Sequence, residues 1–141
     1  MAIGQPTQTT TVRVGSISAG SDDELPVFVA PHDCVVQKIY ASNASNLAAA
    51  STDYTTLSFE NKGSDGTGTD EIASLNNNSD GDNQDFDEFD AVDFGTLANN
   101  TLSKGDVVSF KKEDAESGSA IDEMAVTIVF EAQGGLNQFQ H

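Results

Sequence analysis

Short segments in which hydrophobic residues occupy every second position recur along this chain. In residues 124–132 the hydrophobic positions are Met124, Val126, Ile128 and Phe130, with one residue between each pair. Side chains of a β-strand point alternately to opposite faces, so this period of two predicts a strand with one buried face. Similar patterns, rich in β-branched and aromatic residues, occur in five further segments: 9–17, 25–31, 34–42, 54–63 and 105–113. The pattern therefore predicts six or more short strands.

Turn-forming residues separate the predicted strands. Clusters of Gly, Asp and Ser lie near residues 20, 65, 104 and 117. The best helix-forming stretch, NLAAAS at 46–51, is too short for an independent helix. A parallel sheet needs long crossover connections, usually helices, and none is predicted. The sequence therefore predicts an all-β fold, a single β-sandwich resembling a jelly roll.

The chain divides by composition into arms, a folded body and an insertion. We expect an N-terminal arm over 1–10, a β-sandwich domain over 11–132 and a C-terminal tail over 133–141. Within the sandwich, an acidic insertion covers about 64–103, with ten of the 23 acidic residues, no basic residue and few strand signals. Long segments of this kind in compact domains are usually functional or disordered loops, so we expect a long acidic loop here.

Both predicted arms are polar segments that contain a few apolar side chains. These residues are Ile3, Pro6, Leu136 and Phe139. Terminal segments are poorly ordered unless a partner holds them, and apolar side chains in polar tails favour docking onto another surface. The four residues are therefore the candidate attachment points, with simple fraying as the alternative.

The charge of the chain narrows the classes of partner. With 23 acidic and six basic residues, the net charge is -17 at neutral pH. Such a surface repels nucleic acid and anionic membranes, because binding to phosphates requires Lys and Arg.

Cys34 is the single cysteine, so an intrachain disulfide is excluded. The sequence shows neither a secretory signal pattern nor an apolar run of membrane-spanning length, which predicts synthesis in the cytoplasm.

The densest acidic stretch is NNNSDGDNQDFDEFD, residues 76–90. Its carboxylates are Asp80, Asp82, Asp85, Asp87, Glu88 and Asp90. An EF-hand fits poorly, because Asn76 stands where the first ligand is normally Asp, Asp87 where the last is normally Glu, and no flanking helices are predicted. Six carboxylates could still supply the oxygen ligands of a structural Ca²⁺. The alternative is a solvated loop held by Phe86, Phe89 and Phe94 dipping into the sandwich.

Candidate enzyme chemistry is weak throughout. His32 and Cys34 are two residues apart on a predicted strand, which seldom gives a nucleophile and its base, so we expect a buried Cys34 and a surface His32. Neither a zinc constellation nor a scaffold for a glycosidase carboxylate pair is present in the sequence. The glycines of G-x-x-G-x-G at residues 63–68 lack the following Lys and helix of a phosphate loop, so a turn is expected. The sequence therefore indicates a protein that is not an enzyme and carries no cofactor beyond a possible Ca²⁺.

The order of several motifs resembles a known class of virion protein. The motifs are FVAPHDCVVQKIYASNAS at 28–45, DYTTLSFENKGSDGTGTDEIASL at 53–75, TLSKGDVVSF at 101–110 and MAVTIVFEA at 124–132. Over about residues 12–132 the chain resembles the capsid decoration (cement) proteins and related head-fibre modules of tailed bacteriophages, which are β-sandwiches.

The resemblance implies a function, a location and partners. It implies a structural protein that binds the outer surface of a phage capsid and stabilises it. The partner would be the major capsid protein, with self-association as a trimer, and the protein would be made in the host cytoplasm and end on the exterior of the virion. From the residues alone, a calcium-dependent carbohydrate- or protein-binding β-sandwich module remains open, as does an accessory domain of a secreted hydrolase.

Overall fold

A computed structural model describes residues 7–80 and 86–133 of the chain. Its strands are β1 (Thr7–Val14), β2 (Asp23–Val29), β3 (Cys34–Ser42), β4 (Thr55–Asn61), β5 (Asp70–Asn76), β6 (Val92–Asp93), β7 (Thr101–Leu102), β8 (Val107–Asp114) and β9 (Met124–Ala132). No helix occurs in the described part of the chain. The prediction of an all-β fold is therefore confirmed, and the six predicted strand segments correspond to β1, β2, β3, β4, β8 and β9.

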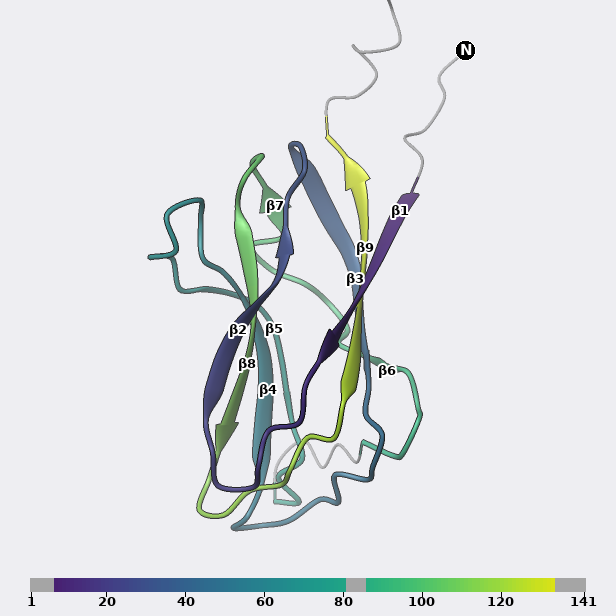
Figure 1. Ribbon diagram of the computed structural model, residues 1–141, viewed down its shortest axis with the longest axis vertical. Coiled ribbons are helices and arrows are strands. Elements are labelled where there is room, and N and C mark those ends of the chain that lie inside the picture. Colours follow the sequence, from purple (N-terminus) through teal and green to yellow (C-terminus); the bar gives the residue numbers. More distant parts are fainter. Residues whose placement is uncertain (1–6, 81–85, 134–141) are drawn as a thin grey trace, which may run out of the picture.

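The strands form two antiparallel sheets that lie face to face as two layers (Figure 1). One sheet has the order β1-β9-β3-β6, with β7 also paired to β3, and the other has the order β2-β8-β4-β5. Successive strands cross from one sheet to the other, except that β4 and β5 share one sheet and β6 and β7 share the other. This is the connectivity of a jelly roll, in which two Greek keys are wound into one sandwich. The predicted β-sandwich of jelly-roll type is the fold observed.

The hydrophobic core lies between the two layers. Its largest fully buried side chains include Phe59 and Leu57 of β4, Phe110 of β8 and Ile39 of β3. Phe59 contacts both Phe110 and Phe94, with ring centroids 5.5 and 5.0 Å apart. Because alternate residues of each strand point inward, the period of two in the sequence becomes the packed interior.

The acidic insertion contains more regular structure than its composition suggested. We expected a long loop over about 64–103, but β5, β6 and β7 lie within it. β5 pairs with β4 along its whole length, with one register shift between Phe59 and Glu60. The shift leaves Ile72 as an extra residue, so Ile72 and Ala73 are both buried although they are adjacent. This bulge removes the alternation by which a strand is recognised.

The two ends of the described sandwich meet at one edge of the molecule. Thr7, the first residue of β1, pairs with Glu131 near the end of β9. β1 thus begins four residues before the boundary expected at residue 11, and it begins beside the end of β9 (Figure 1). Residues 1–6 and 134–141 therefore connect to the same end of one sheet.

Candidate functional site

The described carboxyl-terminal half of the acidic stretch is a turn bound to the chain after β3. Leu47 and Phe86 form an isolated antiparallel bridge, with N–O distances of 2.9 and 3.3 Å. The Phe89 amide donates to the carbonyl of Asn43 at 2.9 Å, and the Glu88 amide donates to the Asn46 side chain at 2.6 Å. Four hydrogen bonds to residues 43–47 therefore hold the acidic turn, which we define as residues 86–90, on the body of the sandwich.

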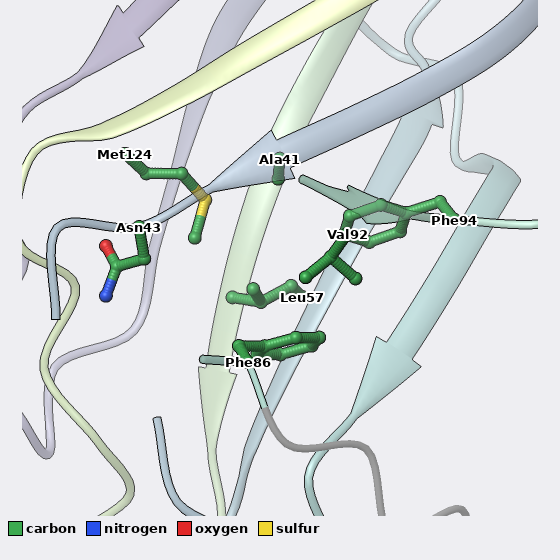
Figure 2. Close-up of a pocket in the computed structure, with 7 residues that line it drawn as sticks. All are labelled: Ala41, Asn43, Leu57, Phe86, Val92, Phe94 and Met124. Carbon is green, nitrogen blue, oxygen red and sulfur yellow. The ribbon is translucent and has the colours of Figure 1, made fainter. Parts of the chain in front are cut away.

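The three phenylalanines expected to hold this loop do not behave alike. Phe86 and Phe94 are buried, and they close the core beside Leu57 and Met124 (Figure 2). The space among these side chains admits no water-sized molecule. Phe89 is instead 71% exposed, so the prediction that it dips into the sandwich is wrong.

Phe89 also has an unusual backbone conformation. Its φ is 63°, in the left-handed region that residues with a Cβ rarely adopt. The side chain of Phe89 is exposed to solvent. Residues 87, 88 and 90 on either side of Phe89 are all exposed carboxylates. The acidic turn therefore presents one aromatic ring surrounded by negative charge.

The predicted calcium ligands are only partly within the described residues. Asp80, Asp87, Glu88 and Asp90 are exposed, and Asp82 and Asp85 lie outside the described residues. In residues 7–80 and 86–133, no group of three or more His, Cys, Asp or Glu side chains is arranged to hold a metal ion. The calcium site stays a prediction that depends on residues 81–85. The four predicted attachment residues Ile3, Pro6, Leu136 and Phe139 also lie outside the described part of the chain.

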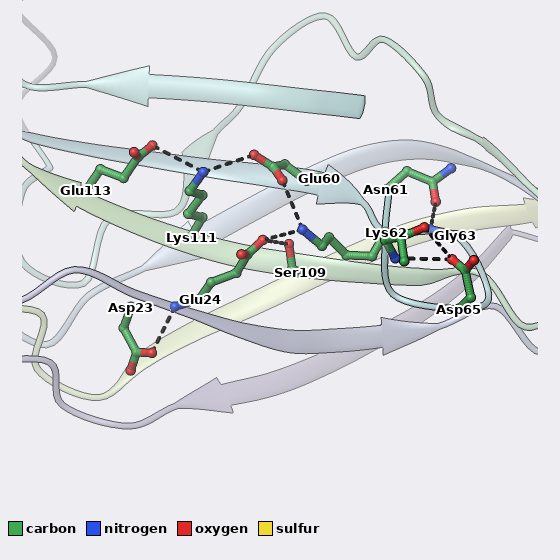
Figure 3. A network of polar contacts seen from close by, with 11 residues as sticks. Asp23, Glu24, Glu60, Asn61, Lys62, Gly63, Asp65, Ser109, Lys111 and Glu113 are labelled. Atoms are coloured by element: carbon green, nitrogen blue, oxygen red, sulfur yellow. Dashed lines mark hydrogen bonds and ion pairs between the residues drawn. The ribbon is translucent and has the colours of Figure 1, made fainter. Parts of the chain in front are cut away.

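A network of ion pairs covers the outer face of the sheet that contains β2, β8 and β4 (Figure 3). The Lys62 ammonium lies 3.2 Å from Glu24 and 3.4 Å from Glu60, and Lys111 lies 3.4 Å from Glu60 and 3.7 Å from Glu113. Glu60 is only 9% exposed, because the long side chains of the two lysines lie over it. Two of the six basic residues are thus used in holding carboxylates on this face.

The contacts within this network shift the pKa values of Glu24, Lys62 and Lys111. The hydrogen bond from the Ser109 hydroxyl, 2.7 Å from Glu24, lowers the pKa of Glu24, and Lys62 adds to the effect against the opposing influence of burial. The Glu24 carboxylate in turn raises the pKa of Lys62. The pKa of Lys111 is raised mainly by the charge of Glu113. All three groups therefore stay charged over a wider range of pH than they would alone.

A second polar network is buried at the far end of β8. The β8 residues Val108, Phe110 and Lys112 follow the inward-facing alternation, so Lys112 points into the sandwich and is fully buried. Its ammonium donates to the carbonyls of Ser18 and Ser21 at 3.2 and 2.9 Å and to the carboxylate of Asp114. The three N–H donors of Lys112 thus have three acceptors.

The carboxylate of Asp114 is satisfied in the same way. It accepts hydrogen bonds from the Gly20 amide at 2.7 Å and the Thr55 hydroxyl at 2.8 Å, as well as from Lys112. The network joins the loop between β1 and β2 to β4 and β8, and so fixes this loop on the end of the sheet that contains β2, β8 and β4. The network was not predicted from the sequence, although the i, i+2 spacing of Lys112 from Phe110 indicates an inward side chain.

The other candidate residues have structural roles. Cys34 is fully buried, as predicted, and burial raises the pKa of its thiol, with the charges of Asp33 and Asp106 adding to this. His32 is half-buried, and its ring centroid lies 6.1 Å from that of Phe130. The glycine segment at 63–68 is a turn, in which Gly63 and Gly66 have positive φ and the Thr67 amide lowers the pKa of Asp65 by donating to its carboxylate. None of these groups forms an activated nucleophile.

Comparison with known proteins finds a likeness in fold. No protein-family model matches the chain, and no curated protein sequence matches it. Among solved structures, the fold is similar to that of a chain in the "Cyanophage Pam1 capsid asymmetric unit". The TM-score is 0.50 at 17% sequence identity, and the match covers 94% of this chain and 89% of that chain. The shared feature is the jelly-roll sandwich as a whole.

No helix in the described residues is long and apolar enough to span a membrane.

Proposed function

We propose that this protein is a structural protein of a bacteriophage virion that binds the outer surface of the capsid and stabilises it. The observation that carries the proposal is the fold match to a chain of a cyanophage capsid, which extends over nearly the whole of both chains. A match of that extent supports a common architectural role better than a shared local motif would. Because a fold by itself does not define a function, the proposal also depends on the chemistry of the surface and on an experimental test.

The chemistry of the described surface suits a protein that attaches without catalysis. The interior beside Phe86 and Phe94 is filled, and the titratable groups of the outer face are engaged in ion pairs. The net charge of -17 keeps separate copies soluble before they bind. A high local concentration on a shell then converts many weak contacts into firm attachment.

The proposed contacts to the major capsid protein are the two terminal segments. Residues 1–6 and 134–141 connect to the same end of the sheet, because Thr7 pairs with Glu131. Apolar anchors at Ile3, Pro6, Leu136 and Phe139 would therefore meet the shell at one place. Ordering both segments on the shell couples attachment to local folding. The resemblance in sequence implies a trimer on the capsid exterior, and three pairs of arms would multiply each weak contact.

The test uses heads assembled from the major capsid protein of the same phage and lacking this protein. We expect the full-length protein to co-sediment with the heads up to a fixed ratio and to raise the temperature at which they break open. A variant with Ile3→Ser and Phe139→Ser should bind less at the same concentration, and Thr96→Ser, an exposed change in a loop, should bind as the wild type does. Absence of co-sedimentation with these heads would refute the proposal.

The alternative of a calcium-dependent binding module predicts a different outcome. Titration calorimetry of the protein with CaCl₂ should then show stoichiometric binding and a large rise in melting temperature, because a ligand that binds only the folded state stabilises it. Binding to heads in the presence of a chelator would support the virion function without calcium.

A further inference from the structure

The four edges of the two sheets differ in how they are protected from pairing with another strand. β2 contains Pro26, which has no N–H to donate, and a register shift between Pro26 and Phe28. The edge of β5 is covered, because the amide of Ala98 and the side chain of Asn99 donate to the carbonyls of Ile72 and Glu71. Proline, bulges and covering loops are the usual means by which proteins block edge-to-edge association.

The edge formed by β6 and β7 is protected by shortness. Each strand has two residues, and between them β3 is covered by hydrogen bonds from Phe94 to Ile39 and from the Asn100 side chain to Val36. Very short, interrupted strands offer no continuous ladder to a second chain. Three of the four edges are therefore closed.

The fourth edge, β1, has none of these devices. It is eight residues long and pairs with β9 in one unbroken register from Thr7 to Val14, as the outermost strand of its layer (Figure 1). Its sequence, TQTTTVRV, contains no proline and no glycine and is rich in β-branched residues. In the described part of the chain, no backbone hydrogen bond reaches β1 from any element other than β9. Every second residue therefore points its N–H and C=O groups away from the sheet.

The charge of β1 also differs from that of the rest of the molecule. The chain carries 23 acidic residues, but β1 contains no carboxylate and one basic residue, Arg13. Association of two copies brings two net charges of -17 together, and the repulsion is smallest where the contact itself is free of acidic groups. β1 is thus an open strand without acidic residues, where electrostatic repulsion of a second copy is weak.

We propose that β1 pairs antiparallel with β1 of a second copy of this chain, so that one sheet continues across a two-fold dimer. This dimer replaces the trimer that the resemblance in sequence implies. The exposed face of β1 consists of Thr7, Thr9, Thr11 and Arg13. Opposed residues of an antiparallel pair share a face, so these four must oppose one another across the two-fold axis.

The register follows from which residues are accessible. Val14 is 1% exposed, so the pairing uses residues 7–13 and is centred on Thr10. Thr9 then lies opposite Thr11 of the second copy. Arg13 lies opposite Thr7 of the second copy, whose neighbour on β9 is Glu131. Arg13, which is paired with Glu123 of its own chain at 3.1 Å, thus lies at each end of the contact, two strands from Glu131 of the second copy.

A charge exchange on β1 tests this register. The double variant Thr9→Asp/Thr11→Asp places two pairs of carboxylates opposite each other, and the variant Thr9→Asp/Thr11→Lys places two pairs of opposite charges there. Both variants lose the Thr11–Thr127 hydroxyl contact equally. Cross-strand pairs of like charge are destabilising and pairs of opposite charge stabilising, so the association constants of the two variants should differ by about tenfold or more.

The measurement is sedimentation velocity of the full-length protein over a wide range of concentration, at low and at high salt. We expect wild-type dimers that strengthen with salt, monomers for Thr9→Asp/Thr11→Asp, and dimers again for Thr9→Asp/Thr11→Lys. Thr96→Asp, with one added charge in an exposed loop, should dimerise nearly as the wild type does, and circular dichroism should show all variants folded. A monomeric wild type at the highest concentration in high salt would overturn the proposal. So would any oligomer, including a trimer, whose stability is the same in both double variants.

Discussion

At the scale of single residues, the buried ammonium of Lys112 has a large predicted effect on stability. Its three acceptors are Ser18, Ser21 and Asp114, and neither charge has access to solvent. Lys112→Met keeps the length of the side chain but leaves the Asp114 carboxylate buried without its counter-ion. Loss of one partner of a buried pair costs about 3–5 kcal/mol, so the free energy of unfolding in urea should fall by that amount. Lys104→Met, at an exposed position, is the control, and equal stability of the two variants would contradict the prediction.

Phe86 and Phe89 make a matched pair in the same turn, one buried and one exposed at positive φ. Phe86→Ala should lower the free energy of unfolding by about 3–5 kcal/mol, because it opens a cavity in the core. Phe89→Asn should leave stability unchanged or raise it by up to about 1 kcal/mol, because Asn adopts the left-handed region more easily. Thermal unfolding of both variants decides this. A large loss in Phe89→Asn would mean that the exposed ring contributes to the stability of the fold.

At the scale of elements, the ion-pair network across β2, β8 and β4 makes stability depend on pH. The pKa of Glu24 is lowered from its ordinary value of 4.5, so its charge stabilises the fold above that value. The contribution is lost as the pH falls through the lowered pKa. Glu24→Gln should therefore be less stable than the wild type near neutral pH, by less than about 1 kcal/mol for this partly exposed group, and equally stable in acid. Urea titrations across the acidic range measure the difference.

Glu71→Gln, at an exposed position of β5, is the matched control for that experiment, since it also removes one negative charge. Its stability relative to the wild type should not follow the profile of Glu24→Gln. On the alkaline side, the raised pKa of Lys62 keeps its pairs with Glu24 and Glu60 intact until the pH rises above the ordinary lysine value of 10.5. A difference between wild type and Glu24→Gln that persists in strong acid would contradict the assignment.

A strand could be predicted from the sequence where its alternation of apolar and polar residues is regular. The alternation of apolar and polar residues in β9 and around Leu57 and Phe59 of β4 predicted both strands, because the apolar positions of each face the core. β5 was missed because its bulge buries the adjacent residues Ile72 and Ala73. Strands as short as β6 and β7 carry too few residues for any period to appear.

At the scale of the whole molecule, the features that matter for contact depend on pairing between distant parts of the chain. Composition alone predicted the acidic surface, and local pattern predicted the buried Cys34. The open edge of β1 could not be predicted, because it follows from the places of all strands in the two sheets. The outward ring of Phe89 depends in the same way on hydrogen bonds to residues 43–47, which precede it by about forty positions in the chain.

The net charge of -17 also predicts how the whole molecule responds to salt. Mutual repulsion destabilises the compact state, and the screening length falls from about 14 Å in about 0.05 M NaCl to about 4 Å in about 0.5 M. Each kcal/mol of repulsion removed should raise the melting temperature by roughly 4 °C for a chain of this size. Scanning calorimetry in NaCl, MgCl₂ and CaCl₂ at equal ionic strength separates screening from a specific site. Equal melting temperatures in MgCl₂ and CaCl₂ mean that the acidic stretch at 80–90 is a solvated surface, because screening does not distinguish the two cations. A further rise in CaCl₂ alone, reversed by a chelator and lost in Asp87→Asn/Asp90→Asn, would establish the calcium site instead.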